Sequence, residues 1–176
     1  MRITETSLQG VFVVEPTVHG DHRGYFMETY SEKRWLDVGL SIRFVQDNHS
    51  RSEKTGTLRG LHYQLEPYAQ AKLVRVVAGS VFDVAVDIRP NSPTRGQWFG
   101  LELSSSNRKQ LYIPRGFAHG FCTLEDATEV VYKVDQYYSS EHDRGIIWND
   151  PQLAIQWPTD QPLLSDKDRL HPALDV

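Results

Sequence analysis

The chain has 176 residues, of which 39% are hydrophobic, and a formal net charge of -4. This length and composition are typical of one domain with a single core, so we expect residues 1–176 to form one domain. The slightly acidic charge argues against sequence-independent binding of nucleic acid. A local cluster of cations inside a cleft could still hold a phosphorylated ligand.

Two features bear on the location of the protein. Residues 1–10 contain no long apolar run, and no later stretch reaches the apolar length that crosses a bilayer, so we expect no membrane partner. The only cysteine, Cys122, has no partner for a disulfide within the chain, which favours a reducing compartment. We therefore predict a cytoplasmic protein.

One short helix is predicted near the N-terminus. Ser31 can cap the segment 32–38, and Gly39 can end it. Ahead of this segment, His19 and His22 form a pair in a stretch rich in glycine and aspartate. No third metal ligand is near them in the sequence, so we interpret this stretch as a solvated loop.

Further along, short segments rich in β-branched and aromatic residues alternate with glycine, proline and asparagine, which indicates strands. Strands are expected at 73–77, 81–88, 98–103, 110–113, 117–123 and 128–136. The segment 78–80 predicts a hairpin between the first two, and 114–116 predicts a turn. Within 81–88, apolar residues alternate with Asp83, Ala85 and Asp87, so one face should be apolar.

This rhythm predicts an all-β fold. A double-sheet jelly roll, or double-stranded β-helix, with a few short helices suits the spacing best, because its interior can hold a ligand. The polar tail beyond Trp157 should wrap around this barrel. Tyr132 shares strand parity with Val130 and Val134, so its phenol is inside if that face is the inner one. From parity alone, a tyrosine bonded to the backbone of the core is the commoner role.

The segment 56–64 carries Arg59 and His62, and Lys72 follows on what we expect to be a neighbouring strand segment. One imidazole and two cations suit removal of a proton from a carbon beside the carbonyl of an anionic substrate. A single histidine in a strand is more often structural, but repulsion from the two cations favours its neutral, proton-accepting form.

Such a histidine also needs a carboxylate that orients its other ring nitrogen. Asp83, Asp87 and Asp168 are candidates, and spacing in the sequence does not choose among them.

A metal site of the cupin type is only partly present. Gly56 and His62 have the spacing of the first cupin motif, but Gln64 replaces its second histidine, and the two possible glutamate positions are Tyr68 and Ala69. The second motif is partly present in 114–119, which ends in His119. Two histidines and a glutamine are poor ligands for a catalytic transition metal. We therefore predict no metal.

Several blocks along the chain resemble the dTDP-4-dehydrorhamnose 3,5-epimerase family of cupin-fold sugar-nucleotide epimerases. In order, they are DHRGYFME at 21–28, FVQDNHS at 44–50, LRGLHYQ at 58–64, VFDVAVDIRP at 81–90, IPRGFAHGF at 113–121, WNDP at 148–151 and LSDKD at 164–168. The resemblance covers nearly the whole chain, and several blocks in the right order are more specific than any one of them.

The resemblance implies 3,5-epimerisation of dTDP-4-dehydro-6-deoxy-D-glucose to dTDP-4-dehydro-L-rhamnose, without metal or cofactor. The C4 carbonyl of this dTDP-4-keto-6-deoxyhexose acidifies the protons at C3 and C5. By the family's pattern His62 is the base and Asp168 is the carboxylate that orients it. Tyr132 is then the acid on the opposite face, and Lys72 stabilises the enolate.

The same pattern implies a substrate-binding set. Arg23, Arg59 and Lys167 suit the pyrophosphate, Phe26, Glu28, Gln46 and Asn48 contact the substrate, His119 and Asp143 border the site, and Tyr138 stacks on the thymine. Members of this family exchange an N-terminal strand across a dimer. The resemblance therefore implies a homodimer in which Arg23 and Glu28 reach the site of a neighbouring subunit.

Three alternatives remain open at the level of sequence. One is an epimerase that inverts only C5 or only C3 of a related dTDP-4-keto-deoxysugar. Another is a metal-dependent cupin oxygenase or isomerase, and a third is a sugar-nucleotide binding barrel without catalysis. The joint presence of base, orienting carboxylate, lysine and phenol argues against the last one.

Overall fold

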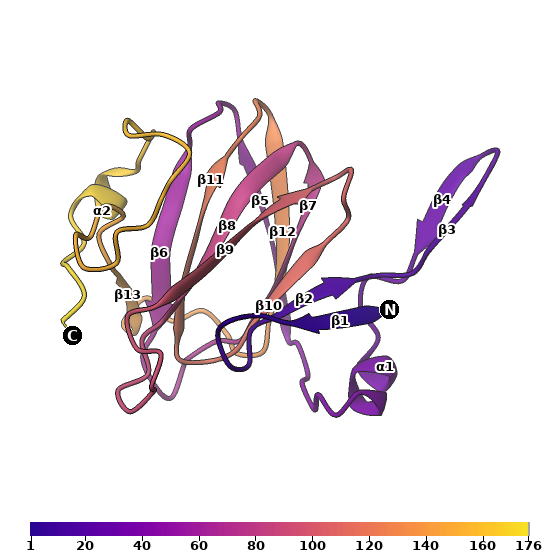
Figure 1. The fold of residues 1–176 in the computed structure, drawn as a ribbon, viewed down its shortest axis with the longest axis horizontal. Coiled ribbons are helices and arrows are strands. Elements are labelled where there is room, and N and C mark those ends of the chain that lie inside the picture. The colour runs from indigo at the N-terminus through magenta and orange to yellow at the C-terminus, as the bar shows by residue number, and fades with distance from the viewer. Residues whose placement is uncertain (176) are drawn as a thin grey trace.

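The computed structural model describes residues 1–175 and consists mainly of two antiparallel sheets packed face to face (Figure 1). In spatial order, the first sheet contains β1 (Arg2–Glu5), β2 (Phe12–Glu15), β10 (Gln110–Ile113), β7 (Lys72–Ala78), β12 (Thr128–Val134) and β5 (Gln46–Ser52). The second contains β13 (Asp143–Gly145), β6 (Leu58–Gln64), β11 (Phe117–Thr123), β8 (Ser80–Asp87) and β9 (Trp98–Ser104). The predicted all-β jelly roll is confirmed.

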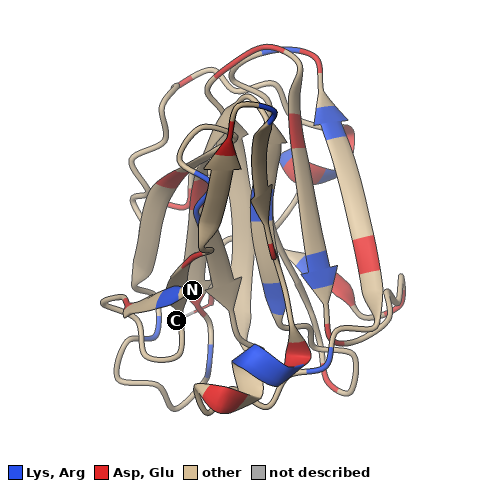
Figure 2. Cartoon of the chain, turned by 90° about the vertical axis from the view of Figure 1, so that its right-hand side faces the viewer, with Lys and Arg blue, Asp and Glu red and all other residues tan. Residues whose placement is uncertain are grey.

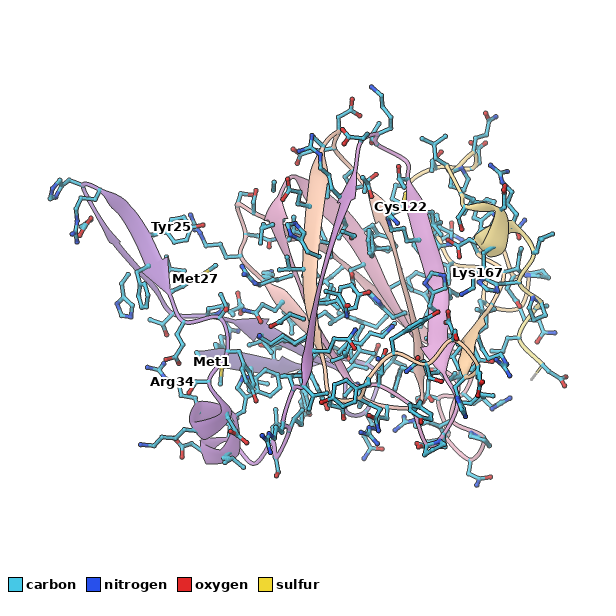
Figure 3. The ribbon with its side chains drawn as sticks, turned by 180° about the vertical axis from the view of Figure 1, so that it is seen from behind. Met1, Tyr25, Met27, Arg34, Cys122 and Lys167 are labelled. Carbon is cyan, nitrogen blue, oxygen red and sulfur yellow. The ribbon has the colours of Figure 1, made fainter. Side chains whose placement is uncertain are left out.

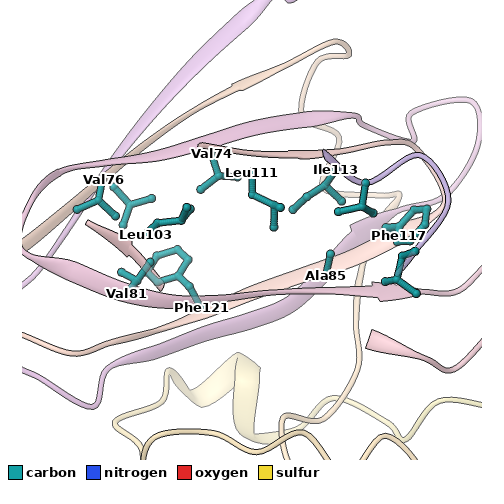
Figure 4. Close-up of a cluster of buried hydrophobic side chains, with 12 residues drawn as sticks. Val74, Val76, Val81, Ala85, Leu103, Leu111, Ile113, Phe117 and Phe121 are labelled. Atoms are coloured by element: carbon teal, nitrogen blue, oxygen red, sulfur yellow. The ribbon is translucent and has the colours of Figure 1, made fainter. Parts of the chain in front are cut away.

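Apolar side chains from the two inner faces fill the space between the sheets on the side of β9 and β10 (Figure 4). Val74, Leu111 and Ile113 project from one sheet, and Val81, Ala85, Leu103, Phe117 and Phe121 project from the other. Val130 and Val134 are buried, and Tyr132 packs against the same cluster, so the inner parity of Tyr132 is confirmed.

The hairpin predicted at 78–80 is wrong. β7 and β8 do follow one another through Gly79, but they belong to different sheets, so the chain crosses the sandwich there instead of folding back within one sheet. Gly79 has a φ of +72°, and a Cβ at this position would lie 2.4 Å from Thr128 Oγ1. A glycine that permits a sharp corner gives the same sequence signal as a hairpin turn.

The prediction of one apolar face on β8 was incomplete, because both faces of this strand are buried. Val81 and Ala85 point into the barrel, whereas Val84 and Val86 point outward and are covered by the C-terminal part of the chain. Ile146, Leu153, Ile155, Trp157 and Leu174 provide that cover. Of these residues, Leu174 belongs to the predicted tail, so the tail covers the barrel together with the segment before it.

Residues 1–175 contain two short helices, α1 (Glu32–Asp37) and α2 (Asp166–Arg169). The side chain of Ser31 caps α1, as predicted. The one-turn helix α2 was not predicted, because a single turn leaves no apolar period in the sequence. The last predicted strand was too long by two residues: β12 ends at Val134, and the carboxylate of Asp135 turns aside to accept hydrogen bonds from Ala71 N and Arg115 Nε.

A separate two-stranded ribbon, β3 (Val18–Asp21) and β4 (Gly24–Met27), projects away from the barrel (Figure 1). His19 lies in β3 and His22 lies in the turn that joins β3 to β4. Both are exposed, so the predicted solvated loop was wrong for the backbone of His19 and right for His22. Tyr25 and Met27 are labelled on it in Figure 3.

Within residues 1–175, no helix is long and apolar enough to cross a membrane. Cys122 is buried, and burial raises the pKa of its thiol to about 11. On the side turned to the viewer in Figure 2, basic and acidic residues are interspersed along the strands. The cytoplasmic location expected from the cysteine content stays a prediction.

Candidate active site

A cavity of about 520 Å³ lies between the sheets, where the apolar core gives way to polar side chains. Strands β6, β7, β11 and β12 form its walls, and α2 with the preceding residues closes one side. Nine of the predicted site residues line it: Arg59, His62, Lys72, His119, Tyr132, Tyr138, Asp143, Lys167 and Asp168. The structure therefore brings the cations of Arg59 and Lys72 together with the imidazole of His62 and the phenol of Tyr132.

A bulge in β6 makes this possible. Arg59 and His62 are three residues apart and would face opposite sides of a regular strand. Opposite them on β11, however, Phe121 and His119 are only two residues apart, so β6 contains one extra residue and both side chains reach the same cavity. Gly60 sits at this bulge with a φ of +131°, where a Cβ would lie 2.5 Å from Gly120 Cα.

His62 is paired with a carboxylate. Its Nε2 lies 2.6 Å from Asp168 Oδ1, and because an ionised carboxylate only accepts hydrogen bonds, Nε2 carries the proton and Nδ1 is left to act as an acceptor. Asp168 is held in place by the first turn of α2, where Ser165 Oγ accepts a hydrogen bond from its backbone N–H. Burial by itself raises the pKa of Asp168, but bonds and charges from His62, Ser165 and His171 outweigh burial and lower it.

Lys72 and His62 lie on different sheets, not on neighbouring segments as the sequence suggested, and they line the cavity from opposite walls. Lys72 is almost fully buried, and burial lowers its pKa from 10.5 to about 8 against the opposing charges of Asp143 and Asp83. Tyr132 stands on β12, next to β7. Burial also raises the pKa of its phenol, so Tyr132 holds its proton at neutral pH.

A second pair of histidine and aspartate lies beside the first. His119 Nε2 is 2.9 Å from Asp83 Oδ2, and both side chains are buried. Asp83, one of the three candidates for orienting His62, therefore binds His119, while Asp87 binds Arg89, Ser92 and Thr94 at the end of β8. Burial lowers the pKa of His119, opposed by the charge of Asp83.

Polar contacts tie the mouth of the cavity together. Asp143 Oδ2 accepts a hydrogen bond from Tyr138 and forms an ion pair with Lys167. Lys167 belongs to α2 and lies beside β6 in Figure 3. Gln64, at a ligand position of the cupin motif, instead bonds to three backbone groups, at Tyr68, Tyr137 and Ser139. These bonds make Gln64 a structural residue of the segment that carries Tyr138.

Five predicted residues do not line this cavity. Arg23 is 78% exposed on the projecting ribbon and pairs with Asp21, Phe26 is also exposed there, and Glu28 pairs with Arg34. Gln46 and Asn48 bond to each other on β5, and Gln46 also accepts the backbone N–H of Tyr138. Within one subunit, these residues are separate from the site or act on it only through the Tyr138 segment.

His171 is a neighbour of the site that the sequence analysis did not identify. Its Nε2 lies 3.4 Å from Asp168 Oδ1, and its ring lies edge-on to His62 with centroids 5.6 Å apart. Burial and the nearby charge of His62 lower the pKa of His171. The signal in the sequence was its position three residues after Asp168. With His62 and Asp168 it forms the one group in residues 1–175 with ligand atoms close enough to hold a metal ion.

A jelly-roll barrel that holds paired proton-transfer groups beside cations is typical of the cupin-like epimerases of nucleotide sugars. Comparison with known proteins identifies the family. The family model described as dTDP-4-dehydrorhamnose 3,5-epimerase matches residues 5–175, and the chain belongs to this family. It is therefore an isomerase.

The similarity extends over nearly the full length. A dTDP-4-dehydrorhamnose 3,5-epimerase of Shigella flexneri is 57% identical over 169 residues, which cover 96% of this chain and 93% of the relative. A relative from Streptomyces niveus, named dTDP-4-dehydrorhamnose 3-epimerase, is 39% identical over 170 residues. These residues cover 96% of this chain and 82% of the relative.

Solved structures agree with these relatives. The enzyme of Bacillus anthracis, with TDP and PPi bound, has a TM-score of 0.96 and 51% identity, covering 98% of this chain and 99% of that one. The enzyme of Legionella pneumophila, in complex with dTDP-4-keto-L-rhamnose, has a TM-score of 0.94 and 50% identity, covering 98% and 92%.

Proposed function

We propose that the chain converts dTDP-4-dehydro-6-deoxy-D-glucose to dTDP-4-dehydro-L-rhamnose by inverting C3 and C5 through proton transfer, without a metal. The observation that carries this proposal is the short contact between His62 and Asp168 at the cavity, with Lys72 on the facing wall. The names of the most similar relatives, and the sugar nucleotide bound in the Legionella structure, support the choice of substrate.

Each inversion begins with removal of a proton from the carbon beside the C4 carbonyl. Nδ1 of His62 accepts this proton, and Asp168 stabilises the imidazolium that forms. The electron pair of the broken C–H bond moves into the C–C bond, and the C4 oxygen becomes an enolate oxygen. The buried ammonium of Lys72 stabilises this negative charge. In a site with little water, such a charge contributes about 10²- to 10³-fold to the rate.

The inversion ends with return of a proton to the opposite face of the ring. Tyr132 projects from the sheet that faces His62, and its raised pKa keeps the proton on the phenol until the enolate takes it. Tyr132 then regains a proton from solvent, and His62 releases the one it took. The same two groups can act on C3 and on C5 if the ring turns or shifts between steps.

The nucleotide end of the substrate carries the diphosphate, and its ligands are cations. Arg59 and Lys167 line the cavity on either side of the base, and an arginine can bind a phosphate through two N–H groups at once. Tyr138 stands at the mouth with one face of its ring free for a thymine, because it is largely exposed.

We also propose that two copies form a homodimer in which the ribbon β3–β4 reaches the cavity of the partner. Arg23 and Phe26 are 78% and 71% exposed on a ribbon whose two strands, within residues 1–175, pair only with each other. In a dimer, the ribbon would add a third cation and an aromatic side chain to the nucleotide end. The single-domain organisation expected from length stays a prediction.

A mono-epimerase is the second candidate, because the Streptomyces niveus relative carries the name of a 3-epimerase. To test the proposal, the purified chain is treated with a chelator and mixed with dTDP-4-dehydro-6-deoxy-D-glucose, and the product is analysed by NMR. We expect inversion at both carbons. Inversion at C3 or C5 alone would replace the proposal with the mono-epimerase, and activity only after a metal is added would exclude its metal-free mechanism.

A further inference from the structure

We propose that His62, Asp168 and His171 form a binding site for a divalent transition-metal ion such as Zn²⁺, and that an ion bound there inhibits the enzyme. The inhibitory part rests on the proposed function, because the group it disables is the proposed base. The binding part rests only on the geometry of the three side chains.

The three side chains converge on one point. The nitrogen and oxygen atoms they offer all lie within 4.8 Å of one another. His171 Nε2 is 3.4 Å from Asp168 Oδ1, close to the separation of about 3.3 Å between neighbouring ligands in a tetrahedral zinc site. His62 Nε2 is 2.6 Å from the same oxygen, so an ion would enter by a small outward movement of His62, whose side chain is 34% exposed.

His171 is oriented toward this point but has no hydrogen bond there. Its side chain is only 9% exposed, and its buried Nε2 has Asp168 Oδ1 at 3.4 Å but no hydrogen bond of good geometry among the described residues. A buried polar nitrogen left without a partner is costly, and a metal ion would satisfy it. Gly145 on β13 leaves the space that the ring occupies, since a Cβ there would lie within 2.4 Å of three of the ring atoms.

The chemistry of the ligands selects the kind of ion. Two imidazoles and one carboxylate suit zinc and other transition metals, whereas magnesium and calcium prefer oxygen ligands. The site shares only His62 with the cupin motif, because Gln64 is bound to backbone groups and His119 is bound to Asp83.

Metal binding at this point would remove the base. At present the Nε2 proton of His62 is donated to Asp168, and Nδ1 is the acceptor. An ion on Nε2 needs the lone pair of that nitrogen, so the proton moves to Nδ1 and the neutral ring can no longer take a proton from the sugar. The ion also neutralises the charge of Asp168 that stabilises an imidazolium.

The test uses the purified full-length chain after removal of metals with a chelator. Equilibrium dialysis against ZnCl₂ measures the ions bound per chain for the natural protein and for His171→Leu. The epimerisation rate of each variant with zinc is divided by the rate of the same variant in chelator. The control is His49→Leu, which removes an exposed histidine that pairs with Glu129 on the other sheet.

We expect the natural protein and His49→Leu to bind one ion and to lose at least about tenfold in rate, because the ion occupies a general base that contributes about 10²-fold or more. His171→Leu, confirmed as folded by its melting temperature, should bind no ion at the same zinc concentration and lose less than about twofold in rate. Equal binding by His171→Leu would mean an adventitious ion only, and activation by zinc would overturn the inhibitory role.

The two proposals fail separately in this design. Dialysis detects the metal site without any turnover, and the rate in chelator tests the epimerase without any metal. Zinc bound through His171 by a protein that is inactive in chelator would leave the site standing and remove the proposed function.

Discussion

His62 and His119 are cross-strand partners on β6 and β11, yet a different aspartate binds each of them. His62 is hydrogen-bonded to Asp168 in the C-terminal part of the chain, and His119 is hydrogen-bonded to Asp83 on the adjacent strand β8. His62 is 34% exposed at the cavity, whereas His119 and Asp83 are buried. Both histidines line the cavity, but His62 is the more exposed of the two, so the pair of His62 and Asp168 is the better placed to exchange protons with a substrate and with solvent.

Asp168→Asn should lower kcat by about 10²-fold or more, the usual contribution of a positioned general base. The amide can still accept the His62 proton, but it has no charge to stabilise the imidazolium. The matched comparison is Asp83→Asn, which removes the charge beside His119. Because this charge also helps to keep Lys72 protonated, kcat should fall in Asp83→Asn as well, but by less than in Asp168→Asn. Steady-state kinetics and thermal melts distinguish the two, and an equal or larger loss of kcat in Asp83→Asn would reverse our assignment of the base.

Lys72→Met should lower kcat by about 10²- to 10³-fold and at the same time stabilise the fold. Burial lowers the pKa of Lys72 to about 8, so the folded state disfavours the ammonium. This destabilisation is fully present below pH 8 and disappears as the pH rises from about 8 to 10.5. At pH 7 the methionine variant should therefore gain up to about 3 kcal/mol in the free energy of unfolding.

The control for this variant is Lys133→Met, on the same sheet. Lys133 pairs with Asp47 at the surface, so its loss should change stability by less than about 1 kcal/mol and leave kcat nearly intact. Denaturant titration at pH 7 gives both free energies. If the Lys72→Met protein were less stable than the natural chain, the claim that burial of this ammonium destabilises the fold would be wrong.

The rate should fall on the alkaline side as Lys72 loses its proton. Since the pKa of Lys72 is about 8 in the free protein, kcat/KM should decline as the pH rises through about 8. Lys72→Arg keeps a positive charge to much higher pH, so any remaining activity should lack this decline. A profile of kcat/KM from pH 6 to about 10 for both proteins makes the comparison, and an unchanged decline in the arginine variant would assign it to another group.

Gly60→Ala should distort the bulge that turns Arg59 and His62 to the same cavity. Its φ of +131° is unfavourable for alanine, and the new Cβ would lie 2.5 Å from Gly120 Cα. Gly24 has the same φ of +131° with no atom within 4 Å of its Cβ position, so Gly24→Ala reports the backbone effect alone. We expect Gly24→Ala to lower the free energy of unfolding by about 1–3 kcal/mol and Gly60→Ala to lower it clearly more. Equal losses in thermal melts would show that the close approach of β6 and β11 is unimportant.

The exchanged ribbon makes a prediction about mixed dimers. His62→Ala and Arg23→Ala should each be weak or inactive alone, because each proposed site uses His62 of its own chain and Arg23 of the other. Co-expression should restore about a quarter of the natural activity, since half of the dimers are mixed and one of their two sites has both residues. Activity that stays at the level of the separate variants would contradict a shared site.

The sequence predicted the local features better than the pairing of the strands. The strands at 110–113 and 117–123, the cap at Ser31 and the inward side of Tyr132 were right because they depend on neighbouring residues. The hairpin at 78–80 was wrong because a glycine corner between sheets has the same local signal as a turn within one.

The sequence predicted only part of the active site, because the site also depends on how distant strands pair. Parity puts Arg59 and His62 on opposite faces, and only the pairing with β11 reveals the bulge that reverses this. The choice among three aspartates depended on contacts across up to 106 residues of sequence, which spacing does not encode. His171 was missed because its proximity to His62 depends on a one-turn helix and on the space left by Gly145.

Proton exchange at the sugar tests the central claim most directly. The chain is incubated with dTDP-4-dehydro-6-deoxy-D-glucose in deuterated water that contains a chelator, and the sugar is analysed by NMR and mass spectrometry. We predict deuterium at both C3 and C5, and its loss in a folded His62→Asn variant. Exchange in the natural protein at neither carbon, or equal exchange in the variant, would contradict a histidine base in this barrel.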